Sequence, residues 1–93
     1  MIRSARDDRV WELLAGRTPR RFPPDLARAA SRRLRFLQEA VTFEELRTPP
    51  SNRLEALRGD RAGWFSIRIN RQWRICFRWE DGAAADVEIV DYH

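Results

Sequence analysis

The sequence predicts an α+β fold: a short N-terminal strand, two helices and then an antiparallel β-meander. Apolar residues between positions 25 and 41 recur at helical spacing, whereas those between positions 64 and 79 alternate with polar residues. An Asp-Gly pair at positions 81–82 marks a tight turn before a last apolar run. Helices followed by consecutive antiparallel strands favour a layered arrangement, in which the helices cover the apolar face of the sheet.

The first half of the chain is expected to hold the short strand and both helices. Met1 to Ser4 is predicted to form the strand, and Asp8 to Ala15 the first helix. The second helix is predicted over Asp25 to Ala40, because the preceding Pro24 and the early carboxylate both suit a helix start. The apolar stripe of this helix consists of Leu26, Ala30, Leu34, Leu37 and Val41.

The second half is expected to form the sheet. Phe43 to Arg47 is predicted to form one more helical turn, and Asn52 to Leu57 a further strand. The meander itself is predicted over Trp64 to Asn70, Gln72 to Trp79 and Asp86 to Tyr92. Alternation along these strands gives the sheet one apolar face and one polar face.

Arginines occupy two of the predicted surfaces. The polar sheet face carries Arg68, Arg74 and Arg78, and the second helix carries a row away from its apolar stripe, formed by Arg28, Arg32 and Arg35. Antiparallel sheets often leave one face in water, and a charged helix row is usually a solvated surface. Both sets are also able to bind the phosphate backbone of a nucleic acid, so the two interpretations stay open.

Size and composition limit the classes of protein to which the chain can belong. Its 93 residues suit a single domain, 1–93, with one modest hydrophobic core. It has neither an apolar run of about eighteen residues nor the apolar core of a secretory signal, so it is expected in the cytoplasm, away from membranes. Cys76 and His93 are too few for the usual zinc ligand sets, so neither a metal nor another cofactor is predicted.

The charge of the chain points to a polyanionic partner. All 18 basic residues are arginine, against 14 acids. The net charge is +5 over residues 1–40, +4 over residues 41–78 and −5 over residues 79–93, which describes a basic body with an acidic tail. Arginine binds phosphate in a bidentate manner and stacks on bases, which favours nucleic acid. The absence of lysine has a second explanation in genomic base composition.

A longer pattern runs from Asn52 to Phe77 and ends with a terminal Asp-Tyr-His. It reads L-x-x-L-x-G-D-R-x-G, then S-I-x-x-N-x-x-W-R-I-x-F, then D-Y-H. In motif and spacing the chain resembles the HigB-type toxins of the RelE/ParE superfamily. The resemblance implies a RelE-like microbial RNase fold and a toxin of a type II toxin–antitoxin system.

The resemblance also implies an activity and partners. The activity is that of a ribosome-dependent endoribonuclease (an mRNA interferase) that cuts messenger RNA without a metal. The 2′-hydroxyl attacks the neighbouring phosphate. The implied partners are a helix-turn-helix antitoxin of the HigA type, the ribosome and messenger RNA. Operator DNA would be bound only through the complex with the antitoxin.

Site residues carry over from the motif. In such toxins the terminal triplet contributes to the active site, which corresponds to Asp91, Tyr92 and His93. The arginine of the Trp-Arg-Ile strand is a further member, here Arg74, and a basic residue before Gly-Asp-Arg also contributes, here Arg58. A histidine titrates near neutrality and can exchange protons, whereas a guanidinium stays charged and can only hold the phosphate.

One position departs from the family pattern. Some relatives carry histidine where this chain has Glu55. A carboxylate can also accept a proton, so Glu55 is kept as a candidate catalytic residue. Two alternatives stay open: a ParE-like toxin of the same fold that inhibits DNA gyrase, and a module that binds RNA or antitoxin after losing its active site. The terminal triplet argues against the first alternative, and Glu55 favours the second.

Overall fold

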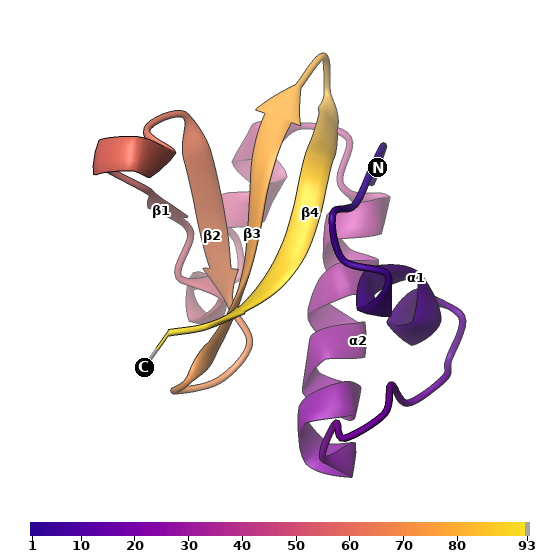
Figure 1. The fold of residues 1–93 in the computed structure, drawn as a ribbon. Coiled ribbons are helices and arrows are strands. Elements are labelled where there is room, and N and C mark those ends of the chain that lie inside the picture. The colour runs from indigo at the N-terminus through magenta and orange to yellow at the C-terminus, as the bar shows by residue number, and fades with distance from the viewer. Residues whose placement is uncertain (93) are drawn as a thin grey trace.

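The computed structural model of the chain describes residues 1–92; the predicted site residue His93 lies outside the described residues. Within residues 1–92 the α+β fold is confirmed, with two α-helices and a four-stranded antiparallel sheet in the order β1-β2-β3-β4 (Figure 1). The elements are α1 (Arg9–Leu14), α2 (Pro24–Glu39), β1 (Glu55–Ala56), β2 (Trp64–Arg68), β3 (Trp73–Glu80) and β4 (Ala83–Asp91). Short 3-10 helices are η1 (Phe43–Arg47), η2 (Pro50–Asn52) and η3 (Gly59–Arg61).

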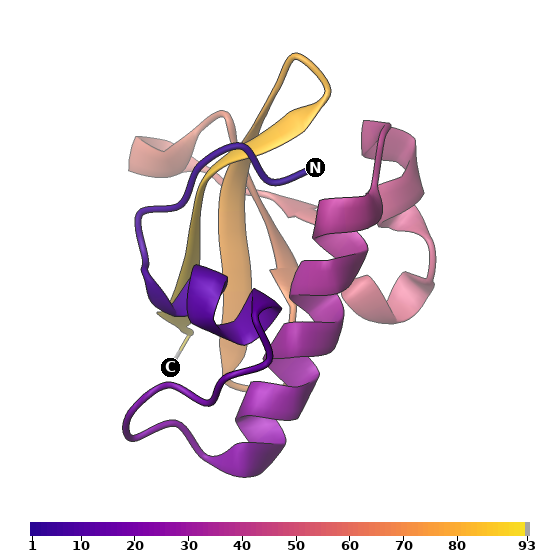
Figure 2. The same cartoon turned by 90° about the vertical axis from the view of Figure 1, so that its right-hand side faces the viewer.

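The hydrophobic core lies between the helices and one face of the sheet. Figure 2 shows α2 running along that side of the sheet, with α1 next to it. Leu34 and Leu37 of α2 share a core cluster with Ile67, Ile75 and Phe77 of the central strands, and all five are fully buried. Each such side chain contributes about 1.5–3 kcal/mol relative to an exposed position. The predicted alternation of β2 and β3 is thereby confirmed. Ile67, Ile75 and Phe77 face the helices, and their sequence neighbours in the two strands face the other side of the sheet.

The C-terminal end of α2 corrects one prediction. Val41 was expected to close the apolar stripe, but its side chain is 71% exposed. The helix ends at Glu39, and Ala40 is extended, with ψ 131°. The chain therefore turns away one residue early and buries Ala40 in place of Val41.

The N-terminal segment pairs with β4 without forming the predicted strand. Two isolated parallel bridges join Ile2 to Ala84 and Ala5 to Val87. Between these bridges β4 contains a β-bulge at Asp86, whose φ is +53°. The extra residue breaks the ladder, so the pairing is interrupted where a continuous strand was expected.

The connections follow their local sequences. The turn between β3 and β4 has positive φ at Asp81 (+49°) and Gly82 (+77°), as a two-residue type I′ hairpin requires, which confirms the predicted turn. The predicted helical turn at Phe43–Arg47 is the 3-10 helix η1, closed by a capping box between Thr42 and Glu45. The strand expected over Asn52 to Leu57 shortens to β1.

Candidate active site

Arg74 lies near the start of β3, on the sheet face opposite the helices. Its Nε donates to the Ser66 hydroxyl at 2.8 Å, and its Nη2 donates to the Arg53 carbonyl at 2.5 Å. Its Nη1 lies 2.9 Å from the Glu55 carboxylate. Arg74 is 8% exposed, so of the two interpretations left open for this face, a freely solvated surface does not apply to Arg74. Two of the three partners, Arg53 and Glu55, come from the edge strand β1 and the residues just before it.

Strand pairing explains how these partners meet. Glu55 of β1 pairs directly with Ser66 of β2, so the two side chains lie on the same face. Arg74 of β3 pairs with Arg68 of β2, two residues further along, and reaches Ser66 diagonally. Arg53 precedes β1 in the left-handed conformation (φ 46°, ψ 58°), and its carbonyl accepts the hydrogen bond from Arg74.

Tyr92 covers the open side of the Arg74 guanidinium. The centre of its ring lies 5.7 Å from the guanidinium carbon, within the range of a cation–π contact. Burial raises the pKa of Tyr92, and the neighbouring Cys76 adds to the rise while Arg74 opposes it. The phenol therefore stays neutral near pH 7. It can donate a hydrogen bond or stack on a base.

A cavity of about 590 Å³ opens beside these side chains. Its lining includes Arg53, Glu55, Arg68, Arg71, Arg74 and Tyr92. Four arginines facing one carboxylate, among the described residues, make this cavity cationic. Its volume falls in the range of small-ligand sites, and its charge suits a phosphate group.

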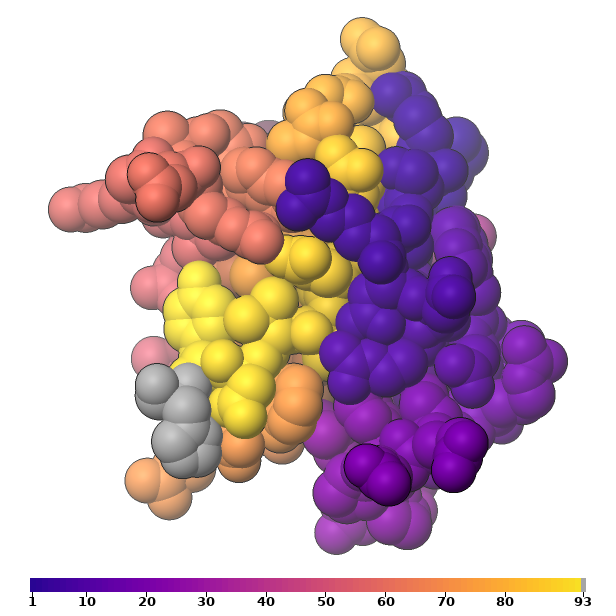
Figure 3. Space-filling model, viewed as in Figure 1, coloured from indigo at the N-terminus to yellow at the C-terminus, as the bar shows by residue number. Residues whose placement is uncertain are grey.

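The structure brings together four of the sequence-predicted site residues: Glu55, Arg68, Arg74 and Tyr92 all line this cavity. Arg58 lines a neighbouring cavity, which shares Tyr92 with the first. Figure 3 shows the C-terminal segment, in yellow, on the surface between the N-terminal segment and the region around η3.

Two other predicted residues are placed differently. Asp91 pairs with Trp73, so the strand register assigns it to the face opposite Arg74, and its carboxylate accepts a hydrogen bond from Gln72 at 3.0 Å. Arg78 lies further along β3 and forms ion pairs with Asp86, at 2.7 Å, and with Glu80. The charge of Arg78 is therefore largely compensated within the fold.

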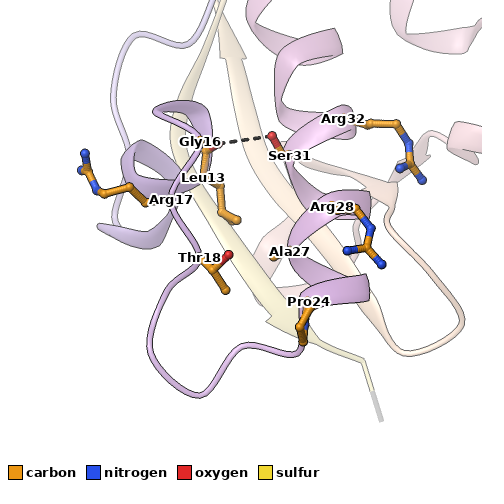
Figure 4. Close-up of a pocket in the computed structure, with 9 residues that line it drawn as sticks. All are labelled: Leu13, Gly16, Arg17, Thr18, Pro24, Ala27, Arg28, Ser31 and Arg32. Atoms are coloured by element: carbon orange, nitrogen blue, oxygen red, sulfur yellow. Dashed lines mark hydrogen bonds between the residues drawn. The ribbon is translucent and has the colours of Figure 1, made fainter.

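The helix arginines form a separate surface. Arg28 and Arg32 line a cavity of about 350 Å³ between α1 and α2, together with Arg17 (Figure 4). Arg28 also pairs with Asp25, and Arg35 is exposed one turn further along α2. These residues belong to the helix layer, so they do not share the sheet cavity with Arg74.

Sequence reasoning missed Ser66, Arg53 and Arg71 as members of the site. Ser66 was assigned to the polar face but not to the site. Its small side chain between Phe65 and Ile67 was the available signal that a longer side chain from a neighbouring strand could pack over it. The Arg53 contribution is a backbone carbonyl, which no residue type reveals. Arg71 lies in the β2–β3 connection, where the sequence predicted a turn and no alternation assigns a side-chain direction.

Within residues 1–92 no three side chains among His, Cys, Asp and Glu gather as a metal-binding group. In that same part of the chain, neither α-helix has the length and apolar character that crossing a bilayer requires.

Comparison with known proteins agrees with this architecture. The sequence model of the HigB-like toxins, described as RelE-like toxin of type II toxin-antitoxin system HigB, matches residues 6–93. Toxin HigB-1 of Vibrio cholerae is 45% identical over 65 residues, which span 70% of this chain and 68% of that protein. Endoribonuclease HigB of Proteus vulgaris is 36% identical over 61 residues, 66% of this chain and 65% of that protein. An uncharacterised protein of Haemophilus influenzae is 31% identical over 77 residues, 82% of this chain and 76% of its own.

A short helical layer on a four-stranded antiparallel sheet, in a chain with this match, is the architecture of the RelE-like toxins. The chain belongs to the HigB-like family of that class, the toxins of type II toxin–antitoxin systems. Membership implies an antitoxin as partner.

Proposed function

We propose that the chain is an endoribonuclease that cuts messenger RNA on the ribosome. The observation that carries this proposal is Arg74, which three partners hold in a cationic cavity beside the ring of Tyr92. A guanidinium fixed in this way stabilises developing charge without reorganising during the reaction. The name of the Proteus vulgaris relative, Endoribonuclease HigB, supports the same reaction class.

The proposed reaction is an internal transfer at one phosphate of the RNA. The 2′-oxygen attacks the neighbouring phosphorus, the bond from phosphorus to the 5′-oxygen of the next nucleotide breaks, and a cyclic phosphate remains. Negative charge grows on the phosphate oxygens during this step. Arg74, Arg68 and Arg71 line the cavity and supply the opposing charge.

Two protons must move in this reaction. We assign the acceptor of the 2′-hydroxyl proton to Glu55, because its carboxylate lines the cavity and is 60% exposed to an incoming substrate. We assign the return of a proton to the leaving 5′-oxygen to His93, since imidazole titrates near neutrality. Tyr92 stays neutral and stacks on a base next to the cleaved bond. Side chains supply every charge and proton in this scheme, so the proposed reaction needs no metal.

Ribosome dependence is proposed because the site is an open cavity. The cavity offers charge and one aromatic ring but little that would fix a flexible RNA in a reactive geometry. The ribosome would hold the message with the 2′-oxygen aligned for attack, which is worth much of the barrier. The helix arginines Arg28, Arg32 and Arg35 are assigned to contacts with ribosomal or messenger RNA. The antitoxin is proposed to be a helix-turn-helix protein of the HigA type, through which the complex binds operator DNA.

The decisive experiment compares ribosome-bound and free message. Purified chain is added to programmed ribosomes and to the same RNA alone, and new ends are mapped by primer extension. We expect discrete cuts within the coding region on ribosomes and few on free RNA. Equal cutting of both would reject ribosome dependence. Intact transcripts together with inhibition of gyrase supercoiling would instead support the ParE-like alternative.

A further inference from the structure

A second cavity adjoins the candidate active site across Tyr92. Its volume is about 280 Å³, and it is lined by Leu57, Arg58, Arg61, Cys76, Val90 and Tyr92. Tyr92 lines both cavities, so its ring lies at their common boundary. An RNA strand that occupies the Arg74 cavity and continues past Tyr92 would enter the second cavity, which is lined by Arg58 and Arg61.

Arg61 is held in place by two interactions. Its guanidinium carbon lies 4.2 Å from the centre of the Trp64 ring, and its Nη2 forms an ion pair with Glu88. Its Nη1 is buried and has no hydrogen-bond partner within the described part of the chain. Burying a donor without a partner is unfavourable, because the group loses its hydrogen bonds to water. A ligand that offers an oxygen to Nη1 would remove that cost.

The remaining walls suit a nucleotide. Leu57 and Val90 supply apolar surface, and the ring of Tyr92 supplies a face on which a base can stack. Burial raises the pKa of the Cys76 thiol, so Cys76 is a neutral wall. Arg58 adds positive charge, whereas Glu88 compensates part of the charge of Arg61. This combination of one fixed donor, an aromatic face and partial positive charge fits a phosphate or base carbonyl attached to a flat ring.

We propose that this cavity is a second nucleotide subsite. It holds the nucleotide next to the pair that flanks the cleaved bond, and Arg61 Nη1 donates to the phosphate or base oxygen of that nucleotide. The inference rests on the proposed RNase function, because it assumes that RNA occupies the Arg74 cavity. It adds Arg61 as a positioning residue that acts on the substrate strand and takes no part in proton transfer.

Binding of short 2′-deoxy oligonucleotides tests the subsite without cleavage or ribosomes. Dinucleotides of random sequence are compared with trinucleotides extended at the 5′ or the 3′ end, using fluorescence anisotropy. We expect one of the two extensions to tighten binding about tenfold, the value of one hydrogen bond to a charged group. Arg61→Gln should abolish this gain and leave the affinity for the dinucleotide unchanged.

Two further variants serve as controls, one for general charge and one for an independent block of the cavity. Arg6 also lies over the Trp64 ring, at 5.1 Å, but it lines neither cavity, so Arg6→Gln should retain the full gain. Leu57→Trp should fill the cavity from the β1 side and abolish the gain with Arg61 intact, which covers the case of an unfolded Arg61→Gln. Circular dichroism and thermal melting confirm the fold of each variant.

The outcomes separate the two proposals. Absence of any gain in the wild type, or equal loss of dinucleotide and trinucleotide binding in Arg61→Gln, would overturn the subsite. Loss of the gain in Arg6→Gln would also overturn it, because the effect would then come from general charge. Absence of any dinucleotide or trinucleotide binding by the wild type would also overturn the subsite, whereas the proposed function is decided separately, by mapping cuts on programmed ribosomes.

Discussion

The Arg74 guanidinium reaches across β2 to the Glu55 carboxylate on β1, with 2.9 Å between the two charged groups. The two partners differ in burial: the side chain of Arg74 is 10% exposed and that of Glu55 is 60% exposed. An exposed carboxylate can be changed at little cost to the fold, whereas the buried guanidinium cannot. The two residues therefore call for different kinds of experiment.

Glu55→Gln tests the proton acceptor. The amide keeps the shape of the side chain but cannot take up the 2′-hydroxyl proton, so we expect cleavage on ribosomes to slow by about 10²–10⁴-fold. The acid limb of the pH–rate profile should disappear, and stability should change by at most about 1 kcal/mol, because the Glu55 carboxylate is 60% exposed and Gln can still accept a hydrogen bond from Arg74.

The control for this experiment is Glu44→Gln. Glu44 forms an exposed ion pair with Arg47 in η1 and does not line the sheet cavity. The Glu44→Gln variant should therefore cleave at the wild-type rate. A small loss in Glu55→Gln with the acid limb retained would mean that Glu55 only holds Arg74. An unchanged rate would remove Glu55 from the mechanism.

Arg74→Ala tests the phosphate contact. Loss of one preorganised stabiliser is expected to cost about 10²–10³ in rate. The burial of Arg74 adds a second effect, since Ser66 and the Arg53 carbonyl lose their partner, and unfolding should become easier by about 1–3 kcal/mol. Single-turnover cleavage is measured below the melting temperature, with Arg47→Ala as an exposed control. A folded Arg74→Ala protein with a near-normal rate would show that Arg74 is structural only.

Tyr92→Phe and Tyr92→Ala separate the ring from the hydroxyl. Because the pKa of Tyr92 is raised, chiefly by burial, the phenol should contribute no ionisation to the rate profile near pH 7. We expect Phe to keep most of the activity and Ala to lose about 1–3 kcal/mol of stacking, measured as weaker RNA binding. Equal losses in both variants would instead assign the role to the hydroxyl.

Asp7 predicts how stability depends on acid. Burial raises the pKa of Asp7, but hydrogen bonds from the Arg9 side chain and from the backbone N–H groups of Ile89 and Arg9 outweigh burial. The pKa of Asp7 therefore lies below its ordinary value of 3.8. A lowered folded-state pKa contributes stability that is present above the unfolded value and is lost as pH falls through the folded one.

Asp7→Asn should therefore lose about 1.5–3 kcal/mol at pH 7 and show a weaker loss of stability below about pH 4. Urea unfolding at several pH values measures both effects. Asp8→Asn is the matched control, because Asp8 is exposed and its side chain makes no capping hydrogen bond. Parallel acid unfolding of Asp7→Asn and the wild type would contradict the assignment.

Local patterns predicted the framework of the fold. The alternation in β2 and β3 assigned Ile67 and Ile75 to the core, and Asp81-Gly82 marked the hairpin, because each depends on residues close in sequence. The burial of Arg74 was not predictable in this way. It depends on the pairing of β1 beside β2, which brings the Arg53 carbonyl and Glu55 to Arg74, and the alternation of β3 carries no information about that pairing.

Relations between distant segments account for the other differences. The terminal triplet was expected to act together, yet pairing with Trp73 directs Asp91 to the helix side while Tyr92 meets Arg74. The cavity beside Tyr92 was likewise invisible, since Arg61 and Val90 come from separate parts of the sequence. Only the register of the assembled sheet shows which side chains share a face.

The bulge at Asp86 changes the phase of β4. Before it the even-numbered Ala84 faces the core, and after it the odd-numbered Val87 and Ile89 do so. With regular alternation from Ala84, Tyr92 would fall on the helix side and Glu88 in the core. A deletion or insertion of one residue between the turn and the bulge can be absorbed in the hairpin, whereas one between the bulge and Tyr92 would exchange the two faces of the strand end. Changes in length should therefore be tolerated very unequally on the two sides of Asp86.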